Sequence, residues 1–390
     1  AAVDLGPDGV RSPAGILAAR DDGELELLDA DDAGRLLTLV WNVGGRSALE
    51  LFDTCTGERT EGPGVPGAVL TGCVLARNGR SAVVSVESPT AASRLWRLAL
   101  PSLAWTPVDG ASEPPRQLTL VEPTLEHFLA HDGLPLSGWL YRPPGATEPG
   151  PVLLSFHGGP EAQERPAWSA QHQAMVAAGI TVFAPNVRGS TGFGRQFAHA
   201  DDRIGRYSAI ADVRSCVHFL LSHGIAEHDR IAVSGRSYGG YLTLAALVRY
   251  PQVFAAGVDI CGMADLLTFY RDTEPWIAEA AVSKYGHPID DQALLEDLSP
   301  LHQAGSIVAP LLVVHGEHDT NVPIGEAHQI VAALRDLGRP VEYLELPGEG
   351  HEYRMRSSRR ALIETMIDFL RRRLRLAEAS DWALAGRAAS

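Results

Sequence analysis

Two different patterns of apolar positions divide this 390-residue chain. Residues 1–115 contain short runs of apolar residues separated by Gly, Pro, Asn and Asp, a pattern that is typical of β-strands joined by turns. From residue 152 onward, continuously apolar runs alternate with segments whose apolar residues recur every three or four positions. This alternation predicts buried parallel strands connected by helices. The chain therefore combines an all-β segment with an α/β domain.

The all-β segment shows a repeat. One predicted strand pair covers residues 35–43 and 47–52, and a second covers 80–86 and 93–100. The two pairs begin at residues 35 and 80, and blades of a β-propeller repeat at roughly 40–50 residues. We therefore predict about two propeller blades, with a fragment of a β-sandwich as the alternative.

The α/β domain contains six predicted strands and two clear amphipathic helices. The strands cover residues 152–156, 180–184, 230–234, 255–260, 311–314 and 341–346, and the helices cover 208–223 and 326–337. A Glu-Pro-Pro sequence at 113–115 marks the boundary, because proline cannot donate a hydrogen bond to a sheet. We predict a partial propeller at 1–115, a linker at 116–125, a catalytic domain at 126–376 and a tail at 377–390.

Composition excludes several classes of function. The net charge of −15 disfavours a nucleic-acid partner, which would require a basic surface. No apolar run reaches 18 residues, so we expect no membrane-spanning helix. The first twenty residues lack a secretory signal pattern, and the four cysteines form no CxxC pair. These features predict a cytoplasmic protein without a disulfide framework, a metal site or a cofactor.

Ser237 is the candidate nucleophile. It lies in Gly235-Arg236-Ser237-Tyr238-Gly239, which matches G-x-S-x-G and stands between a predicted strand at 230–234 and a predicted helix at 241–249. A sharp turn between strand and helix exposes such a serine above the sheet. The flanking glycines are expected because side chains there would collide with neighbouring backbone.

The acid and the base follow Ser237 in the order that α/β hydrolases use. Asp319 comes just after the predicted strand at 311–314, with Glu317 as the second candidate. His351 follows the strand at 341–346 and would take the proton of Ser237, while Asp319 holds the ring in the correct tautomer. His315 and His318 flank the acid, but two histidines on one loop rarely form a metal site.

An oxyanion hole needs two hydrogen-bond donors. One is the backbone N–H of Tyr238, the residue after the nucleophile. The other is expected in His157-Gly158-Gly159-Pro160, directly after the strand at 152–156, with Gly159 preferred over Gly158. His157 itself is interpreted as a structural hydrogen-bonding residue.

These motifs resemble those of one known family. HGGP at 157–160, PNVRGSTGFG at 185–194, GRSYGGY at 235–241, HGEHDTNVP at 315–323 and PGEGHEY at 347–353 together resemble the prolyl oligopeptidase family of serine peptidases, in its acylaminoacyl-peptidase-like branch. The resemblance implies an α/β-hydrolase domain beneath a β-propeller and a triad of Ser237, Asp319 and His351. It also implies cleavage of small peptides, acyl-amino acids or aminoacyl amides rather than folded proteins.

The resemblance leaves a mismatch in length. About seven blades would need roughly 300 residues, whereas about 115 precede the catalytic domain. Either an N-terminal part is missing, or a separate chain supplies it, or the propeller is reduced. We predict that these residues form the last two or so blades of a larger lid, whose open edge another segment covers. A homo-oligomer is also left open.

The segment after the strand at 255–260 suggests substrate contacts. We expect Glu274 to bind a free substrate amine, and Trp276 with Tyr270 to line an apolar pocket; ordinary surface residues are the alternative. Arg188 either contacts the substrate or forms a structural ion pair. The leading function is a serine exopeptidase or aminoacyl-amide hydrolase. A carboxylesterase and a noncatalytic binding protein on the same fold are the alternatives.

Overall fold

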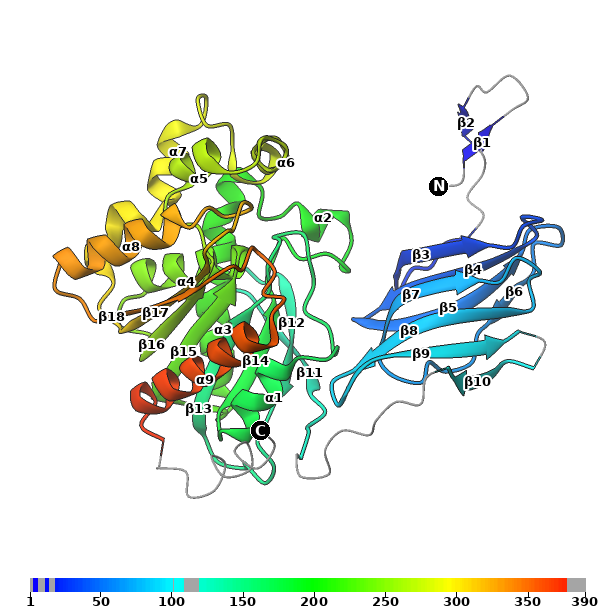
Figure 1. The fold of residues 1–390 in the computed structure, drawn as a ribbon, viewed down its shortest axis with the longest axis horizontal. Coiled ribbons are helices and arrows are strands. Elements are labelled where there is room, and N and C mark those ends of the chain that lie inside the picture. The colour runs from blue at the N-terminus through cyan, green and yellow to red at the C-terminus, as the bar shows by residue number, and fades with distance from the viewer. Residues whose placement is uncertain (1–2, 6–10, 14–17, 101, 109–118, 377–390) are drawn as a thin grey trace. The chain divides into compact units, whose positions relative to one another are not determined.

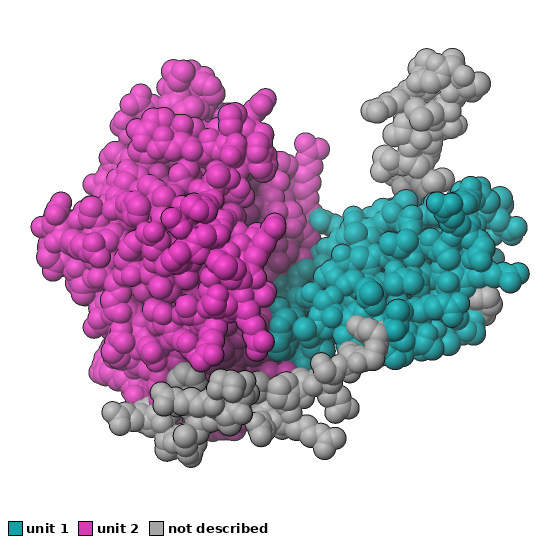
Figure 2. All heavy atoms as spheres, viewed as in Figure 1, with its two compact units in different colours: residues 1–114, 165–168 teal, residues 115–164, 169–390 magenta. Residues whose placement is uncertain are grey.

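The structure is a computed structural model that describes residues 3–5, 11–13, 18–100, 102–108 and 119–376. The predicted boundary at 113–115, the first part of the predicted linker and the tail at 377–390 lie outside these residues. The chain divides into two compact units (Figure 2), with residues 1–114 and 165–168 in unit 1 and residues 115–164 and 169–390 in unit 2.

Unit 1 is built from short antiparallel strands (Figure 1). They are β1 (Val3–Leu5), β2 (Arg11–Pro13), β3 (Glu24–Ala30), β4 (Leu36–Val43), β5 (Arg46–Asp53), β6 (Arg59–Glu61), β7 (Val69–Leu75), β8 (Ser81–Ser88), β9 (Ala91–Ala99) and β10 (Ala104–Pro107). Strands β3 to β6 form one four-stranded sheet in chain order, and β7 to β10 form a second. The two predicted strand pairs are the inner strands of these sheets, and the outer strands were not foreseen.

The two four-stranded sheets of unit 1 share one apolar core. Val40, Leu49 and Leu51 of the first sheet pack with Val84 and Leu98 of the second. Each sheet is thus an antiparallel meander with one face buried against the other. This arrangement is compatible with two adjacent propeller blades, and the covering of their edges by another segment stays a prediction.

Unit 2 contains an eight-stranded sheet. Its strands are β11 (Thr124–Leu129), β12 (Pro135–Tyr141), β13 (Gly150–Phe156), β14 (Thr181–Asn186), β15 (Ala226–Arg236), β16 (Ala256–Ile260), β17 (Leu311–Gly316) and β18 (Val341–Leu346). Their order is β11-β12-β14-β13-β15-β16-β17-β18, and all neighbours from β14 to β18 are parallel. All six predicted strands are present, whereas the antiparallel β11 and β12 were not foreseen, and β11 begins two residues before the expected domain start.

Helices cover both faces of this sheet (Figure 1). They are α1 (Ala170–Ala177), α2 (Arg195–Ala198), α3 (Arg206–Ser222), α4 (Tyr238–Arg249), α5 (Leu266–Asp272), α6 (Pro275–Tyr285), α7 (Gln292–Leu298), α8 (Gly325–Asp336) and α9 (Arg356–Arg373), with short 3₁₀ turns at Arg203–Gly205 and Pro300–Ser306. Apolar residues of α3, α4 and α8 pack on one face, and those of α1 and α9 pack on the other. Since both faces are buried, the central strands are continuously apolar, as the sequence pattern indicated.

None of the helices within the described residues has the length and apolar character needed to cross a bilayer. The parallel arrangement has a further consequence, because all carboxyl ends of β13 to β18 lie along one edge of the sheet. Loops after these strands can therefore bring distant residues together.

Candidate active site

Ser237 lies on a strained turn between β15 and α4. Its backbone has φ 56° and ψ −116°, a conformation that residues other than glycine rarely adopt. The flanking glycines make this turn sterically feasible. A Cβ atom at Gly235 would lie 2.3 Å from the backbone of Gly239, and one at Gly239 would lie 2.2 Å from the carbonyl oxygen of Phe156. The helix begins at Tyr238, three residues earlier than the sequence suggested, so Ser237 stands directly at its N-terminus.

Asp319 and His351 lie in the loops that follow β17 and β18. Nδ1 of His351 donates a hydrogen bond to Oδ2 of Asp319 at 2.8 Å. The other carboxylate oxygen of Asp319 accepts hydrogen bonds from the backbone N–H groups of Asn321 and Val322 at 2.9 and 3.0 Å. Because Nδ1 carries a proton toward Asp319, Nε2 is the nitrogen that can accept one.

The pKa values of this pair are shifted in opposite directions. Burial raises the pKa of Asp319, but hydrogen bonds from His315 and His351 outweigh it and hold this pKa well below its usual range. Burial lowers the pKa of His351, whereas the Asp319 carboxylate and the neighbouring Cys261 side chain raise it above its ordinary value. The Asp319 carboxylate therefore remains ionised at neutral pH and stabilises the imidazolium form of His351.

Ser237 and His351 line the same pocket. It has a volume of about 310 Å³ and is lined mainly by apolar side chains, among them Met263, Phe269, Trp276, Ile277, Ala281 and Tyr285. Gly159, Glu161 and Lys284 supply its polar wall. A small apolar cavity beside a serine and a histidine is suited to holding one side chain of a ligand.

The loop after β13 lies next to Ser237. A Cβ atom at Gly158 would lie 3.5 Å from Cβ of Ser237. Gly159 has φ +117°, and a Cβ there would approach the backbone nitrogen of Glu161 to 2.7 Å, so glycine is required. His157 bonds to the Ser190 hydroxyl at 2.8 Å and to the carbonyl oxygen of Gly158 at 2.6 Å, which holds this loop in place.

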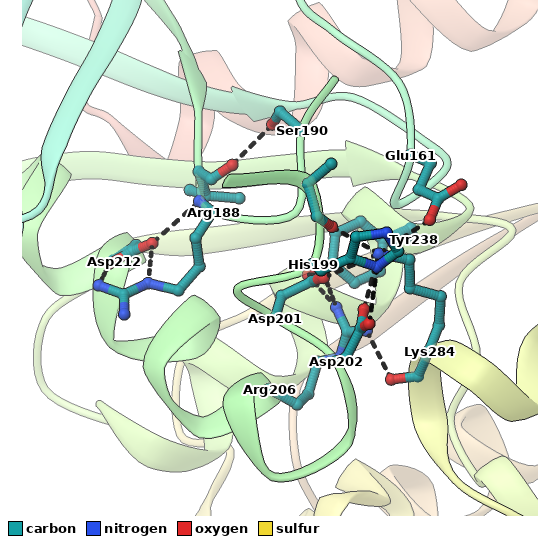
Figure 3. Close-up of polar contacts among 12 residues, drawn as sticks. Glu161, Arg188, Ser190, His199, Asp201, Asp202, Arg206, Asp212, Tyr238 and Lys284 are labelled. Carbon is teal, nitrogen blue, oxygen red and sulfur yellow. Dashed lines mark hydrogen bonds and ion pairs between the residues drawn. The ribbon is translucent and has the colours of Figure 1, made fainter. Parts of the chain in front are cut away.

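A charged cluster, part of which lines the pocket, surrounds a buried arginine, and we call it the Arg206 cluster (Figure 3). Its members are Arg206, Asp201, Asp202, Lys284, Glu161 and Tyr238. Arg206 is fully buried, pairs with Asp201, donates to the Tyr238 hydroxyl and stacks 4.8 Å from the Tyr238 ring centroid. Tyr238 directly follows Ser237 in the sequence, so the cluster holds the first residue of α4 in place.

Lys284 connects the Arg206 cluster to the pocket. Its ammonium group lies 2.7 Å from Asp202, 3.3 Å from Asp201 and 3.0 Å from Glu161. The carboxylates of Asp201 and Asp202 are buried or partly covered, whereas the Glu161 side chain is 51% exposed. No motif in the sequence indicated this cluster, since its members are spread from residue 161 to residue 284.

Among the residues predicted to contact the substrate, only Trp276 lines the pocket, where it is 67% exposed. Tyr270 is buried behind the wall and its hydroxyl donates to the carbonyl oxygen of Gly286 at 2.8 Å. Glu274 is the residue directly before α6, its side chain makes no hydrogen bond to the first turn of that helix, and it does not line the cavity.

Arg188 forms the structural ion pair that was its alternative assignment. Its guanidinium group binds Asp212 and Asp132, with N–O distances of 2.8 Å to each (Figure 3 shows the Asp212 pair). Asp212 is fully buried, so Arg188 supplies the counter-charge that this carboxylate needs. Both groups face the interior of the α/β unit rather than the pocket.

The other titratable groups near the acid have structural partners. Nε2 of His315 lies 2.8 Å from the carbonyl oxygen of Val322 and 3.4 Å from Asp319. Glu317, the second candidate for the acid, accepts a hydrogen bond from the backbone N–H of Gly348 at 2.9 Å. One group within the described residues has the composition of a metal site: Cys261, Asp319 and His351.

The sheet order and a serine on a strand-to-helix turn define an α/β hydrolase preceded by an all-β segment. The model of the prolyl oligopeptidase family matches residues 166–377, which is more than half of the chain. The chain therefore belongs to the prolyl oligopeptidase family, as the motifs indicated.

Among curated relatives, dipeptidyl aminopeptidase BIII of Pseudoxanthomonas mexicana is 34% identical over 230 residues, covering 58% of this chain and 33% of the relative. Dipeptidyl peptidase family member 6 of Caenorhabditis elegans is 36% identical over 212 residues, covering 53% of this chain and 29% of the relative. The chain thus spans about a third of the length of the curated relatives that it matches.

Two solved structures extend the likeness to nearly the whole chain. A puromycin hydrolase matches with a TM-score of 0.86 at 23% identity, covering 96% of this chain and 58% of the other. An acylaminoacyl peptidase in complex with Z-Gly-Gly-Phe-chloromethyl ketone matches with a TM-score of 0.79 at 25% identity, covering 96% of this chain and 59% of the other. The shared fold includes the all-β segment as well as the α/β unit.

Proposed function

We propose that this protein is a serine hydrolase that cleaves small peptides or aminoacyl amides through an acyl-enzyme. The observation that carries the proposal is the joint position of Ser237 and His351 on one pocket, with His351 hydrogen-bonded to Asp319. The names of the relatives, dipeptidyl aminopeptidase and acylamino-acid-releasing enzyme among them, support amide substrates.

Each step of the reaction follows from the position of a group. His351 Nε2 accepts the proton of the Ser237 hydroxyl as the oxygen attacks the substrate carbonyl carbon. The N–H groups of Tyr238 and Gly159 stabilise the negative charge that develops on the carbonyl oxygen. The protonated His351 then gives its proton to the leaving amine, and water hydrolyses the acyl-enzyme by the same steps.

Active-site labelling tests the proposal directly. A fluorophosphonate probe should modify the wild-type protein and fail to modify a Ser237→Ala variant. Ser283→Ala is the matched control, because Ser283 is an exposed serine on α6, the helix that also lines the pocket. Labelling that persists in Ser237→Ala, or is absent from the wild type, would favour the noncatalytic alternative.

The pocket wall supports a preference for substrates with a free amine. In the Arg206 cluster, the two cationic side chains of Arg206 and Lys284 face three carboxylates. Glu161 is the exposed carboxylate of the three, and it lies on the pocket with Ser237. We therefore assign to Glu161 the amine-binding role that sequence reasoning gave to Glu274.

A pair of glutamate variants tests this substrate preference. Glu161→Gln should raise KM for unblocked aminoacyl anilides about 10-fold, because the neutral glutamine side chain cannot form an ion pair with the substrate ammonium group. The KM for N-acetylated anilides, which carry no ammonium group, should stay unchanged. Glu274→Gln is the matched control and should change neither. If Glu161→Gln affects both substrates equally, Glu161 has no role in amine recognition. Comparing kcat/KM for matched p-nitrophenyl esters and anilides separates a peptidase from a carboxylesterase.

We also infer a cytoplasmic location. All four cysteines are free thiols, as expected in a reducing compartment.

A further inference from the structure

Cys261 lies beside two members of the candidate triad. It follows β16 directly, on the sheet between the loops that carry Ser237 and Asp319. Its sulfur, a ring nitrogen of His351 and a carboxylate oxygen of Asp319 all lie within 4.8 Å of one another. The reaction proposed above uses His351 and Asp319, and the Cys261 thiol has no role in it.

The backbone around Cys261 is held firmly. The N–H of Cys261 donates to the carbonyl oxygen of Val314 at 2.8 Å, and the carbonyl oxygen of Ile260 accepts from the N–H of Ser237 at 2.9 Å. Cys261 also has φ 43°, an uncommon value for a residue with a side chain. The thiol is therefore positioned by the same strand ends that position the nucleophile.

The three side chains are ligands that zinc prefers. Zinc binds thiolate sulfur, imidazole nitrogen and carboxylate oxygen at about 2.0–2.3 Å, so ligand atoms in a tetrahedral site are about 3.3–3.8 Å apart. Small side-chain rotations bring three atoms that already lie within 4.8 Å into this range. His351 is the accessible member, since its side chain is 16% exposed and lines the pocket.

Polar groups around the thiol supply an independent observation. The Tyr353 ring is buried against the Cys261 side chain, and its hydroxyl hydrogen-bonds to the sulfur. Arg236 is a second hydrogen-bonding partner of the same sulfur. A metal-bound thiolate would accept from these two donors more strongly than a neutral thiol does, so both donors favour that form of Cys261.

We propose that Cys261, Asp319 and His351 form an inhibitory binding site for a zinc ion. On binding, the S–H bond of Cys261 breaks, its proton goes to solvent, and a sulfur–zinc bond forms without any change of oxidation state. Coordination through Nδ1 of His351 would move the Nδ1 proton to Nε2 and break the hydrogen bond to Asp319, and coordination through Nε2 would occupy the lone pair that accepts the Ser237 proton. Either way the base is removed, and a fourth position remains for water or the Ser237 hydroxyl.

Zinc inhibition of hydrolysis provides the first test. Zinc chloride should inhibit the wild-type protein, and EDTA should restore its activity fully. In Cys261→Ala the half-inhibitory zinc concentration, measured against the metal-free activity of that variant, should rise at least about 10-fold. Cys216→Ala and Cys55→Ser are matched controls for a buried and an exposed thiol, and should keep the wild-type value. Equal inhibition of the wild type and Cys261→Ala would overturn the proposal.

The second test does not depend on catalysis, although the inhibitory effect itself rests on the proposed function. Cobalt(II) added to the wild type and to Ser237→Ala should produce a near-ultraviolet thiolate-to-metal absorption band that is absent in Cys261→Ser, the closest isostere. Absence of the band in the wild type would refute the site even if the protein hydrolyses amides. A band in a protein without hydrolase activity would keep the site and refute the proposed function. Thermal melting of each variant distinguishes loss of binding from loss of folding.

Discussion

Asp319 and His351 are joined by a 2.8 Å hydrogen bond although 32 residues separate them in the sequence. They lie in loops after β17 and β18, two parallel neighbours paired from Leu311–Val341 to Gly316–Leu346. Register and direction of these strands therefore bring both loops to the same edge of the sheet. The loop of Ser237 lies at that edge too, because β15 is joined to β17 through β16.

We predict that Asp319→Asn lowers kcat by about 10³–10⁴-fold with little change in KM, because the ring loses the group that holds its tautomer. Steady-state kinetics with an aminoacyl anilide measures both constants. Glu317→Gln is the matched control, since Glu317 lies two residues from Asp319 on the same loop and accepts a hydrogen bond from the backbone N–H of Gly348 rather than from His351. A similar loss of kcat in both variants would show that the loop, rather than the carboxylate, matters.

The pH dependence of activity should reflect the raised pKa of His351. The base must be neutral to accept a proton, so kcat/KM should rise with pH and reach half its maximum above about 6.5, the ordinary imidazole value. In Asp319→Asn the carboxylate that raises this pKa is gone, and the half-point should move to lower pH. Profiles of the two proteins between pH 5 and 10 test the sign. A half-point at or below 6.5 in the wild type would contradict the geometry.

Tyr238→Phe should separate the backbone of Tyr238 from its side chain. The variant keeps the N–H assigned to the oxyanion, so kcat should change less than about 3-fold. It removes the hydroxyl that accepts a hydrogen bond from buried Arg206, and the free energy of unfolding should fall by about 1–3 kcal/mol.

Urea unfolding and kcat measure these two effects of Tyr238→Phe. Tyr241→Phe is the matched control on the same helix; its hydroxyl donates to the carbonyl oxygen of Leu298, and its loss should cost about 1 kcal/mol. A large loss of kcat at unchanged stability would assign a catalytic role to the Tyr238 hydroxyl.

Arg188→Met should destabilise the protein by about 3–5 kcal/mol, because the buried Asp212 carboxylate is left without its counter-charge. The KM of the remaining folded enzyme should stay unchanged, since Arg188 does not line the pocket. Arg195→Met, at an exposed position in α2, should change stability by less than about 0.5 kcal/mol. A raised KM with unchanged stability would show instead that Arg188 contacts the substrate.

Some features of the site could be recognised from short stretches of sequence. Gly235 is needed because a Cβ atom there would meet the backbone of Gly239, only four residues away. The strand ends before Asp319 and His351 could be recognised because strands buried on both faces are continuously apolar. These are local constraints, so the residues that express them lie close together in the chain.

The sequence by itself thus determined the alternation of strands and helices, the strand ends that carry Ser237, Asp319 and His351, and the family. Only the tertiary structure decided which charges meet. It joined Arg188 to Asp132 and Asp212, gathered the Arg206 cluster beneath the pocket, and placed the Cys261 thiol beside His351. The physical reason is that a buried charge or thiol is satisfied by whichever group the packing brings near it. Such partners come from segments that are distant in the sequence, so the spacing of residues along the chain does not predict which of them pair.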